Sequence, residues 1–419
     1  MSTVVQKYGG TSVADASRIM NVARRIVETY DQGHSVCAVV SARGDTTDEL
    51  KQLASEITPN PPERELDMLL STGERISCAL LAMAIDRLGK HAVSFTGSQA
   101  GIVTDTVHTK ARILDIRAAR LQEAMAEGKI VLVAGFQGVS TEKDITTLGR
   151  GGSDTTAVAL AHALDADVCE IYTDVEGVYT ANPSLVSKAR KVPVISYDEM
   201  LEMAAAGAQV LALRCVEYAR KYNIPIHVRS SFSDAEGTWV REEDDTMESA
   251  IIRGVTYTTD EAKITVRAVP DRPGVAAHVF SALADANVNV DMIIQNIGEE
   301  GHSDISCTIP ADDLAGANDA LRRVVQELGA RGYTAEANIA KVSLIGAGMR
   351  THPGVAAKMF QTLADLGINL QMISTSPIKI SCIIDKERAE EAVRALHDVF
   401  ELDKDMVVRE KADTSTRHD

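Results

Sequence analysis

The chain has 419 residues, of which 45% are hydrophobic and 25% charged, a composition typical of globular proteins with a sizeable core. Its formal net charge of −17 disfavours nucleic acids and membrane surfaces as partners, although a local basic pocket could still bind an anion. The sequence contains no run of 18 or more apolar residues, so it predicts no transmembrane helix. The N-terminus lacks the pattern of a signal peptide, so we expect a cytoplasmic protein. The six cysteines are scattered singly, which favours core thiols in a reducing compartment.

The first part of the chain, residues 1–232, alternates short apolar runs with helical patterns. The expected strands are residues 36–42, 92–96, 130–136, 168–173 and 224–229. Apolar residues recur at helical spacing, first at Val13, Ala16, Met20, Ala23 and Val27, and later at Leu69, Ile76, Leu80 and Met83. Alternating strands and helices predict an α/β domain with a mainly parallel sheet sandwiched by helices.

An internal repeat follows. Residues 233–249 are rich in Ser, Asp and Gly with an acidic run, and predict a linker. Beyond it, PGVAAHVFSALADANVNVDMIIQN from Pro273 is repeated as PGVAAKMFQTLADLGINLQMISTS from Pro353. Each copy reads as strand, Pro-Gly loop, amphipathic helix, Asn turn and strand. One copy cannot bury its helix alone, so we expect two packed units, residues 250–340 with a leading strand and residues 341–410.

The segment KYGGTS, residues 7–12, lies between an expected strand and an expected helix. Gly9 and Gly10 allow a close approach of the backbone to a ligand, and the helix start offers N–H groups to an anion. Lys7 adds a positive charge for phosphate oxygens. An exposed lysine before a glycine turn is the simpler alternative.

A second glycine loop, GRGGSDTTA, covers residues 149–157. Ser153 or Asp154 would serve as the N-cap of the next helix, which is the purely structural interpretation. Arg150 has a guanidinium group suited to a carboxylate. Three glycines around one arginine exceed what a turn needs, so the loop favours a binding site.

Other motifs point to the same edge of the sheet. In YTDVEGVYTANP, residues 172–183, Asp174 and Tyr179 would line the carboxyl edge, where α/β proteins bind ligands; a simple strand exit is the alternative. Glu74 lies in STGERIS at an expected helix start, where the helix dipole alone would also favour it.

Together these motifs, with SARGDTT, FTGSQAGI and the paired C-terminal units, resemble the aspartokinase branch of the amino-acid kinase family over nearly the whole chain. The pattern is closest to the lysine- and threonine-regulated aspartokinases of actinobacteria, and the C-terminal units resemble ferredoxin-like ACT domains, which sense amino acids. The resemblance implies Mg²⁺-dependent transfer of a phosphoryl group from ATP to the side-chain carboxylate of L-aspartate, the first step towards lysine, threonine and methionine. A kinase for another amino acid, or an amino-acid sensor with an impaired kinase site, remains an alternative.

The resemblance also implies roles for individual residues. The catalytic candidates are Lys7 and Asp154. The residues expected to bind aspartate are Ser41, Thr47, Glu74, Arg150 and Ser153. The residues expected to bind the nucleotide are Lys7, Gly9, Gly10, Thr173, Asp174 and Tyr179. The residues expected to contact threonine or lysine as effectors are Asp271, Gly274, Asn289, Gln295, Asn369, Gln371 and Ser381. No metal site made by the protein alone is expected.

The paired ACT units also imply a homo-oligomer, and Met247 could start a short regulatory subunit. In the family the first ACT unit is inserted within the second, so the strand near residues 250–255 could belong to the later unit.

A few positions depart from the family pattern. Ser184 and Gln209 replace an Arg and a Lys expected near ATP, while Arg43 replaces a Met and could supply a charge. In the second ACT unit, Gln371 and Pro377 stand where two glutamates are usual. Losing a partner for an effector ammonium group predicts weakened lysine feedback, unless those glutamates are simply exposed. Pro377 in an expected strand would also remove a backbone N–H.

Overall fold

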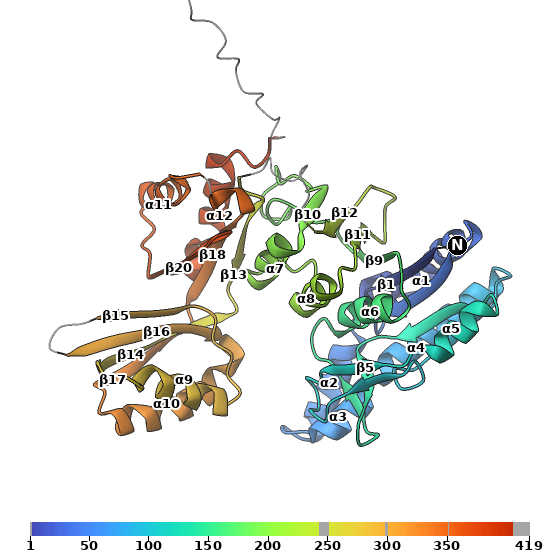
Figure 1. Ribbon diagram of the computed structural model, residues 1–419, viewed down its shortest axis with the longest axis horizontal. Coiled ribbons are helices and arrows are strands. Elements are labelled where there is room, and N and C mark those ends of the chain that lie inside the picture. Colours follow the sequence, from blue (N-terminus) through green and yellow to red (C-terminus); the bar gives the residue numbers. More distant parts are fainter. Residues whose placement is uncertain (1, 243–250, 298–300, 351, 405–419) are drawn as a thin grey trace, which may run out of the picture. The chain divides into compact units, whose positions relative to one another are not determined.

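The computed structural model describes residues 2–242, 251–297, 301–350 and 352–404, which form two compact units (Figure 1). The described part of the first unit comprises residues 2–178, 191–205 and 209–242. The second unit contains the rest of the described chain, including residues 179–190 and 206–208. These two short segments come from the region that the sequence pattern assigns to the first domain.

The first unit is built on an eight-stranded sheet in the order β10-β12-β11-β9-β1-β2-β6-β3. Its strands are β1 (Thr3–Tyr8), β2 (Ser35–Val40), β3 (Ala92–Phe95), β6 (Ile130–Ala134), β9 (Val168–Thr173), β10 (Val194–Ser196), β11 (Ile226–Ser230) and β12 (Thr238–Arg241). All neighbouring pairs are parallel except β11 with β12, which confirms the predicted fold class. Strand β12 lies inside the expected linker, residues 233–249, so the sheet extends further along the chain than predicted.

Helices cover both faces of this sheet. Helices α1 (Ala16–Asp31) and α4 (Thr72–Arg87) pack on one face, and α6 (Gly152–Ala163) contacts β1, β2 and β9 with α8 (Leu213–Tyr222) beside it. The central strands β2 and β6 are almost wholly buried, as expected for parallel strands covered on both sides.

The predicted apolar face of α4 is wrong, although the helix is present. Ile76, Leu80 and Met83 are 49%, 37% and 67% exposed. The helix instead buries a neighbouring stripe that includes Leu81 and Ile85. Helical spacing alone did not distinguish the two stripes because both carry apolar residues.

Smaller elements complete the first unit. A second sheet has the order β5-β4-β7-β8. Its strands are β4 (Ile102–Thr104), β5 (Ile113–Ile116), β7 (Gln137–Ser140) and β8 (Ile145–Thr147). The remaining helices of the unit are η1 (Gly10–Val13), α2 (Thr46–Ile57), α3 (Glu63–Leu70), α5 (Ala119–Ala126) and α7 (Tyr197–Ala205).

The second unit contains the two repeats, each with a four-stranded antiparallel sheet. One sheet has the order β15-β16-β14-β17, and the other β13-β18-β20-β19. The strands are β13 (Gly254–Thr258), β14 (Glu261–Pro270), β15 (Ile293–Ile297), β16 (His302–Pro310), β17 (Gly332–Glu336), β18 (Ile339–Ile345), β19 (Met372–Ser376) and β20 (Lys379–Asp385). The helices are α9 (Val275–Asp285), η2 (Ala311–Asp313), α10 (Leu314–Leu328), η3 (Ala347–Arg350), α11 (Val355–Asp365), η4 (Lys386–Arg388) and α12 (Ala389–Val399).

The pairing of β13 with β18 assigns the leading strand to the second repeat. The boundary that grouped it with residues 250–340 is therefore corrected, in agreement with the inserted arrangement that the resemblance suggested. The Pro-Gly prediction holds in both repeats, because α9 and α11 begin directly after Gly274 and Gly354, whose φ angles are 95° and 99°.

The two repeats exchange equivalent contacts. Lys263 on β14 donates to Gln371 Oε1 of the other repeat at 2.7 Å, and Lys341 on β18 lies 2.5 Å from Asp291 Oδ2. Each lysine occupies the same position in its repeat, as do Asp291 and Gln371. Lys341 also pairs with Glu261. Burial by itself lowers the pKa of Lys341, but the two carboxylates outweigh it and raise that pKa, so the buried lysine stays charged.

Pro377 does not lie in a strand, contrary to the prediction. It forms the turn between β19 and β20, where a proline is well tolerated.

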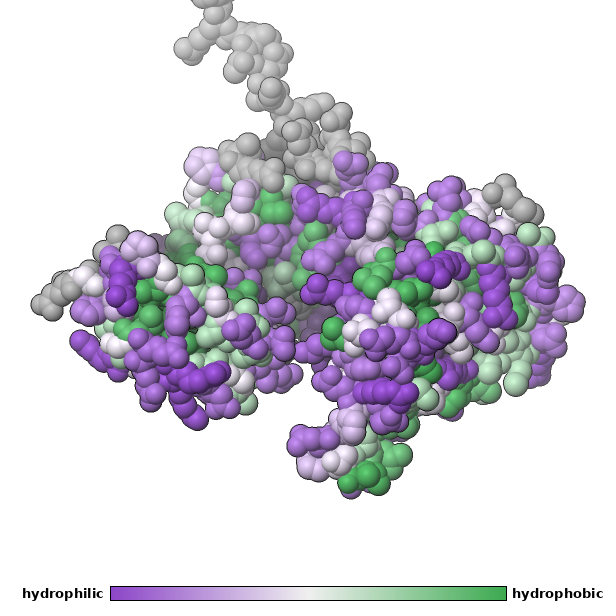
Figure 2. Space-filling model, turned by 60° about the horizontal axis from the view of Figure 1, so that its bottom comes forward, coloured by the Kyte–Doolittle hydropathy of each residue, from purple (hydrophilic) through white to green (hydrophobic). Residues whose placement is uncertain are grey.

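The outer surface is mostly hydrophilic in the face shown in Figure 2. Within the described residues, the stretch Glu63–Arg87 is long and apolar enough to cross a membrane by length and composition alone, and half of it is buried in the first unit. It carries the buried carboxylates Asp67 and Glu74, as a helix of a folded core can. All six cysteines are buried and free, as predicted.

Candidate active site

The glycine loop after β1 lies at the carboxyl edge of the sheet. A side chain on Gly10 would place its Cβ 2.7 Å from the carbonyl oxygen of Ala42, so the position has no room for one. The Gly10 carbonyl accepts a hydrogen bond from the Gly44 N–H, which ties this loop to the one after β2. Helix η1 begins at Gly10, and its N-terminal N–H groups suit an anion.

Lys7 and Asp154 are brought together from β1 and the first turn of α6. Lys7 Nζ lies 2.6 Å from Asp154 Oδ1, and each side chain is only about a tenth exposed (13% and 11%). A Cβ on Gly9 would lie 3.5 Å from Lys7 Nζ, so the ammonium group is held beside the glycine loop. Both catalytic candidates therefore occupy one place.

Glu74 is buried beneath the loop that follows β2. Its Oε1 accepts the N–H of Ala42 at 3.2 Å, whereas its Oε2 is buried and has no hydrogen-bond partner among the described residues. Burial raises the pKa of Glu74 to about 7. A buried carboxylate oxygen without a donor is unusual, and a cationic ligand would satisfy it.

The second glycine loop joins β8 to α6. The N-cap of α6 is Gly151, with φ of 70°, so the prediction of Ser153 or Asp154 as the cap is wrong. Both lie in the first turn, and the Ser153 hydroxyl packs against Gly135 at the carboxyl end of β6. Arg150 is exposed on the loop.

Ser41 and Thr47 lie at the two ends of the loop that joins β2 to α2. Ser41 directly follows β2 and donates its N–H to Tyr8 O at the end of β1, and Thr47 lies in the first turn of α2. Both are partly buried.

The expected nucleotide residues Thr173 and Asp174 stand where β9 ends. Thr173 Oγ1 donates to Asp174 Oδ1 at 3.0 Å, and the Thr173 carbonyl accepts the N–H of Ser231, which follows β11. The hydroxyl of Ser231 lies 2.6 Å from that of Ser12 in η1, which follows the glycine loop after β1. Sequence analysis missed Ser231, because only strand order places β9 and β11 on the same side of β1.

The other expected nucleotide positions are less closely tied to this site. Tyr179 belongs to the second unit, as does Ser184, which forms a turn with its N–H donating to Asn182 Oδ1 at 2.9 Å. Gln209 is exposed in the first unit. Arg43 donates to the carbonyl of Ala14 at 2.9 Å, so it braces the end of η1.

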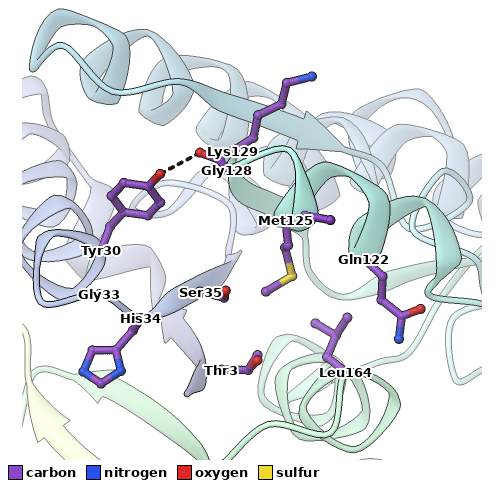
Figure 3. A pocket seen from close by; sticks show the side chains of 11 residues that line it. Thr3, Tyr30, Gly33, His34, Ser35, Gln122, Met125, Gly128, Lys129 and Leu164 are labelled. Carbon is purple, nitrogen blue, oxygen red and sulfur yellow. Dashed lines mark hydrogen bonds between the residues drawn. The ribbon is translucent and has the colours of Figure 1, made fainter. Parts of the chain in front are cut away.

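A cavity of about 440 Å³ lies at the opposite edge of the sheet, near the amino ends of β1 and β2 (Figure 3). Tyr30 lines it and donates its hydroxyl to Gly128 O at 2.8 Å. None of the motif residues lines this cavity. Ligands of parallel α/β sheets bind at carboxyl ends, so we place the candidate site at the motif residues instead.

The expected effector residues are spread over the two repeats. Those that are exposed are Asp271, Gly274, Asn289, Gln295 and Asn369. Ser381, by contrast, is fully buried, with its hydroxyl 2.7 Å from that of Ser343, and Gln371 bridges Lys263 and Asp385. Both side chains are therefore engaged in contacts within the second unit.

Known proteins with this sequence pattern are numerous. Residues 2–230 match the amino acid kinase family, and residues 264–325 and 342–400 match an ACT domain. The aspartokinase of Mycolicibacterium smegmatis is 58% identical over 407 residues, covering 96% of this chain and 97% of the relative. That of Corynebacterium glutamicum is 53% identical over the same length and coverage.

Solved structures agree. Escherichia coli aspartokinase III in complex with aspartate and ADP matches 95% of this chain and 99% of its own, with 27% identity and a TM-score of 0.82. The site geometry, the two domain matches and these full-length relatives lead to one conclusion: the chain is an enzyme of the amino acid kinase family and belongs to its aspartokinases.

Proposed function

We propose that the chain transfers the γ-phosphoryl group of ATP to the side-chain carboxylate of L-aspartate, giving 4-phospho-L-aspartate and ADP. The observation that carries the proposal is the convergence of Lys7 with Asp154, the two glycine loops and the half-satisfied Glu74 at one edge of the sheet. The relatives and the aspartate- and ADP-bound neighbour support the same reaction.

The chemistry suits these residues. A carboxylate with a pKa of about 3.9 is already ionised at pH 7, so the substrate needs no general base. Its oxygen attacks the γ-phosphorus while the bond to the ADP oxygen breaks. Lys7 and the loop N–H groups would stabilise charge on the phosphoryl oxygens, and Glu74 would hold the substrate ammonium group. Arg150 and Ser153 would bind the α-carboxylate of the aspartate substrate.

Mg²⁺ is expected to accompany the nucleotide. The described residues contain no group of three or more His, Cys, Asp or Glu side chains that could hold a metal. Mg²⁺ in phosphoryl-transfer sites is bound largely by phosphates and water with one or two carboxylates, so Asp174 at the end of β9 would suffice. The ion would neutralise phosphate charge.

Acyl-phosphate formation separates the competing functions. Trapping with hydroxylamine over a panel of amino acids should give the hydroxamate of aspartate with ATP and Mg²⁺. Product from glutamate instead would indicate another carboxylate kinase, and no product from any amino acid would indicate a sensor with an impaired site.

Weaker ATP binding than in relatives with the usual residues follows from Ser184 and Gln209. A charge-assisted hydrogen bond contributes about 1.5–3 kcal/mol, so Ser184→Arg or Gln209→Lys should lower the KM for ATP about tenfold. Steady-state kinetics at saturating aspartate measure this. If neither variant changes that KM while Arg43→Met raises it, Arg43 supplies the missing charge despite its bond to Ala14.

Reduced lysine feedback is the expectation for regulation. The contacts of Gln371 in the structure decide what the Gln371→Glu variant should do. A glutamate at position 371 would lie within reach of Lys263, but it would lose the hydrogen bond that the Gln371 amide donates to Asp385 Oδ1 and would face that carboxylate. We expect a melting temperature that is unchanged or slightly lower, and no gain of lysine inhibition. Titrating lysine, threonine and both into the activity assay of wild type and variant gives the answer. Lysine inhibition gained by the variant would show that this position contacts the effector.

A further inference from the structure

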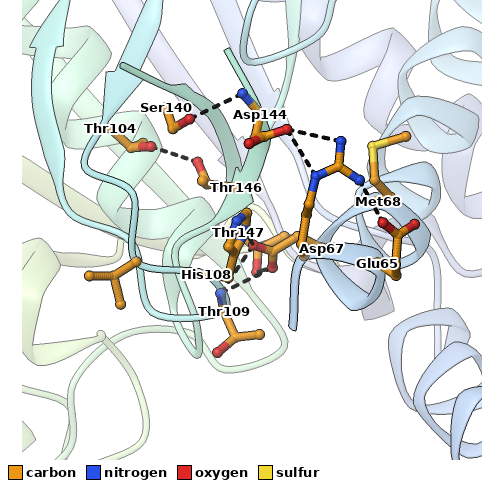
Figure 4. Close-up of polar contacts among 12 residues, drawn as sticks. Glu65, Asp67, Met68, Thr104, His108, Thr109, Ser140, Asp144, Thr146 and Thr147 are labelled. Carbon is orange, nitrogen blue, oxygen red and sulfur yellow. Dashed lines mark hydrogen bonds and ion pairs between the residues drawn. The ribbon is translucent and has the colours of Figure 1, made fainter. Parts of the chain in front are cut away.

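One buried carboxylate outside the described site holds a strained turn. Asp67 on α3 is fully buried (Figure 4). It accepts the Thr109 N–H at 3.1 Å on both oxygens, lies 2.7 Å from His108 Nδ1 and accepts the Thr147 hydroxyl at 2.5 Å. A buried carboxylate with so many donors fixes whatever carries them.

The turn at Thr109 is uncommon. Thr109 has φ of 61°, a left-handed conformation that a β-branched residue rarely adopts, and the Lys110 N–H donates to His108 O at 2.8 Å. A three-residue turn closed in this way with positive φ is the rare, strained form of the γ-turn. Such strain persists only where the surroundings impose it, and it often marks a functional constraint.

The turn lies against the loop that carries Arg150. A Cβ on Gly149 would be 3.1 Å from the Thr109 carbonyl oxygen, so the two backbones are in close contact. Thr147, held by Asp67, precedes Gly149 by two residues, and its carbonyl accepts the Ala111 N–H at 2.9 Å. Asp67 thus fixes both sides of this contact.

A second group braces the same place from α8. Arg214 donates to Leu148 O at 2.9 Å and to Ala111 O at 3.2 Å. Burial lowers the pKa of Arg214, whose guanidinium donates to these two backbone carbonyls. The backbone just before Arg150 is therefore held by Asp67 of α3 and by Arg214 of α8.

We propose that Asp67 is a positioning residue for the aspartate-binding loop: through the turn at residues 108–110 it seats Gly149 and so sets where Arg150 meets the substrate carboxylate. This rests on the proposed role of Arg150. Asp67 acts through the loop and not on the nucleotide, whose expected residues in the first unit lie on or just after β1 and β9.

Asp67→Asn tests the proposal, because the amide replaces one acceptor oxygen by a donor facing donors. We expect the KM for aspartate to rise about tenfold to a hundredfold, with the KM for ATP unchanged. Asp144→Asn is the matched control, since Asp144 is a carboxylate of the adjacent hairpin whose side chain pairs with Arg64 at 2.9 Å (Figure 4). It should leave both KM values unchanged. Thr147→Val, which removes one donor, provides a milder change should Asp67→Asn fail to fold.

A double-mutant cycle with Arg150→Ala tests whether Asp67 affects aspartate binding through Arg150. If Asp67 acts through Arg150, adding Asp67→Asn to Arg150→Ala should raise the KM for aspartate no further. A folded Asp67→Asn or Thr147→Val variant with unchanged aspartate KM overturns the proposal, as does an equal rise in both KM values. If Arg150→Ala itself leaves the aspartate KM unchanged, the proposed role of Arg150 fails instead.

Discussion

Replacing Lys7 by alanine should lower kcat about a hundredfold to a thousandfold while changing the KM for aspartate little. The ammonium group is held beside the glycine loop by Asp154 at 2.6 Å, where the transferred phosphoryl group is expected. An interaction that strengthens as charge develops contributes to the transition state more than to substrate binding. Steady-state kinetics with both substrates varied will measure the separation.

Lys129→Ala is the control for this change. Lys129 is a lysine near the opposite edge of the sheet, paired with Glu127 at 2.5 Å on the surface. It should leave all constants unchanged. A Lys7→Ala enzyme with normal kcat and only a raised KM for ATP would show that Lys7 serves binding alone.

Glu74 should make aspartate binding depend on pH. Because burial raises the pKa of Glu74 to about 7, the free enzyme carries the proton at acidic pH and cannot pair with the substrate ammonium group. We expect kcat/KM for aspartate to fall about tenfold per pH unit below pH 7. Glu74→Gln should raise the KM about tenfold to a hundredfold at pH 8 and abolish this dependence. A Glu74→Gln profile that still falls below pH 7 would assign the titration to another group.

The same pKa predicts an opposite effect on stability. The folded pKa lies above the unfolded value of 4.5, so the native state binds the extra proton between these values and loses stability as the pH rises through that window. Above about pH 7 the ligand-free wild type keeps a buried charge that Glu74→Gln lacks. The variant should therefore melt at a higher temperature than wild type at pH 8, and at a similar one at pH 4.5.

Many strands and glycine loops of the first unit could be predicted from local sequence. Strands such as β2 and β6 are runs of apolar and β-branched residues, and a parallel strand buried on both faces needs such a run. The glycines of residues 7–12 and 149–157 marked the loops, because close backbone approach excludes side chains there. The repeat could be recognised because the two copies share the apolar residues of the helix and the Pro-Gly and Asn turns.

Other features depend on contacts between distant segments, and only the tertiary structure decided them. The pairing of Gln371 with Lys263 places position 371 at the junction of the repeats, although the two residues are 108 positions apart. Asp67 drew no attention in the sequence, because a carboxylate in an amphipathic helix usually faces solvent. Its importance arises from donors on β8 and on the turn at Thr109, which approach it only once the chain has folded.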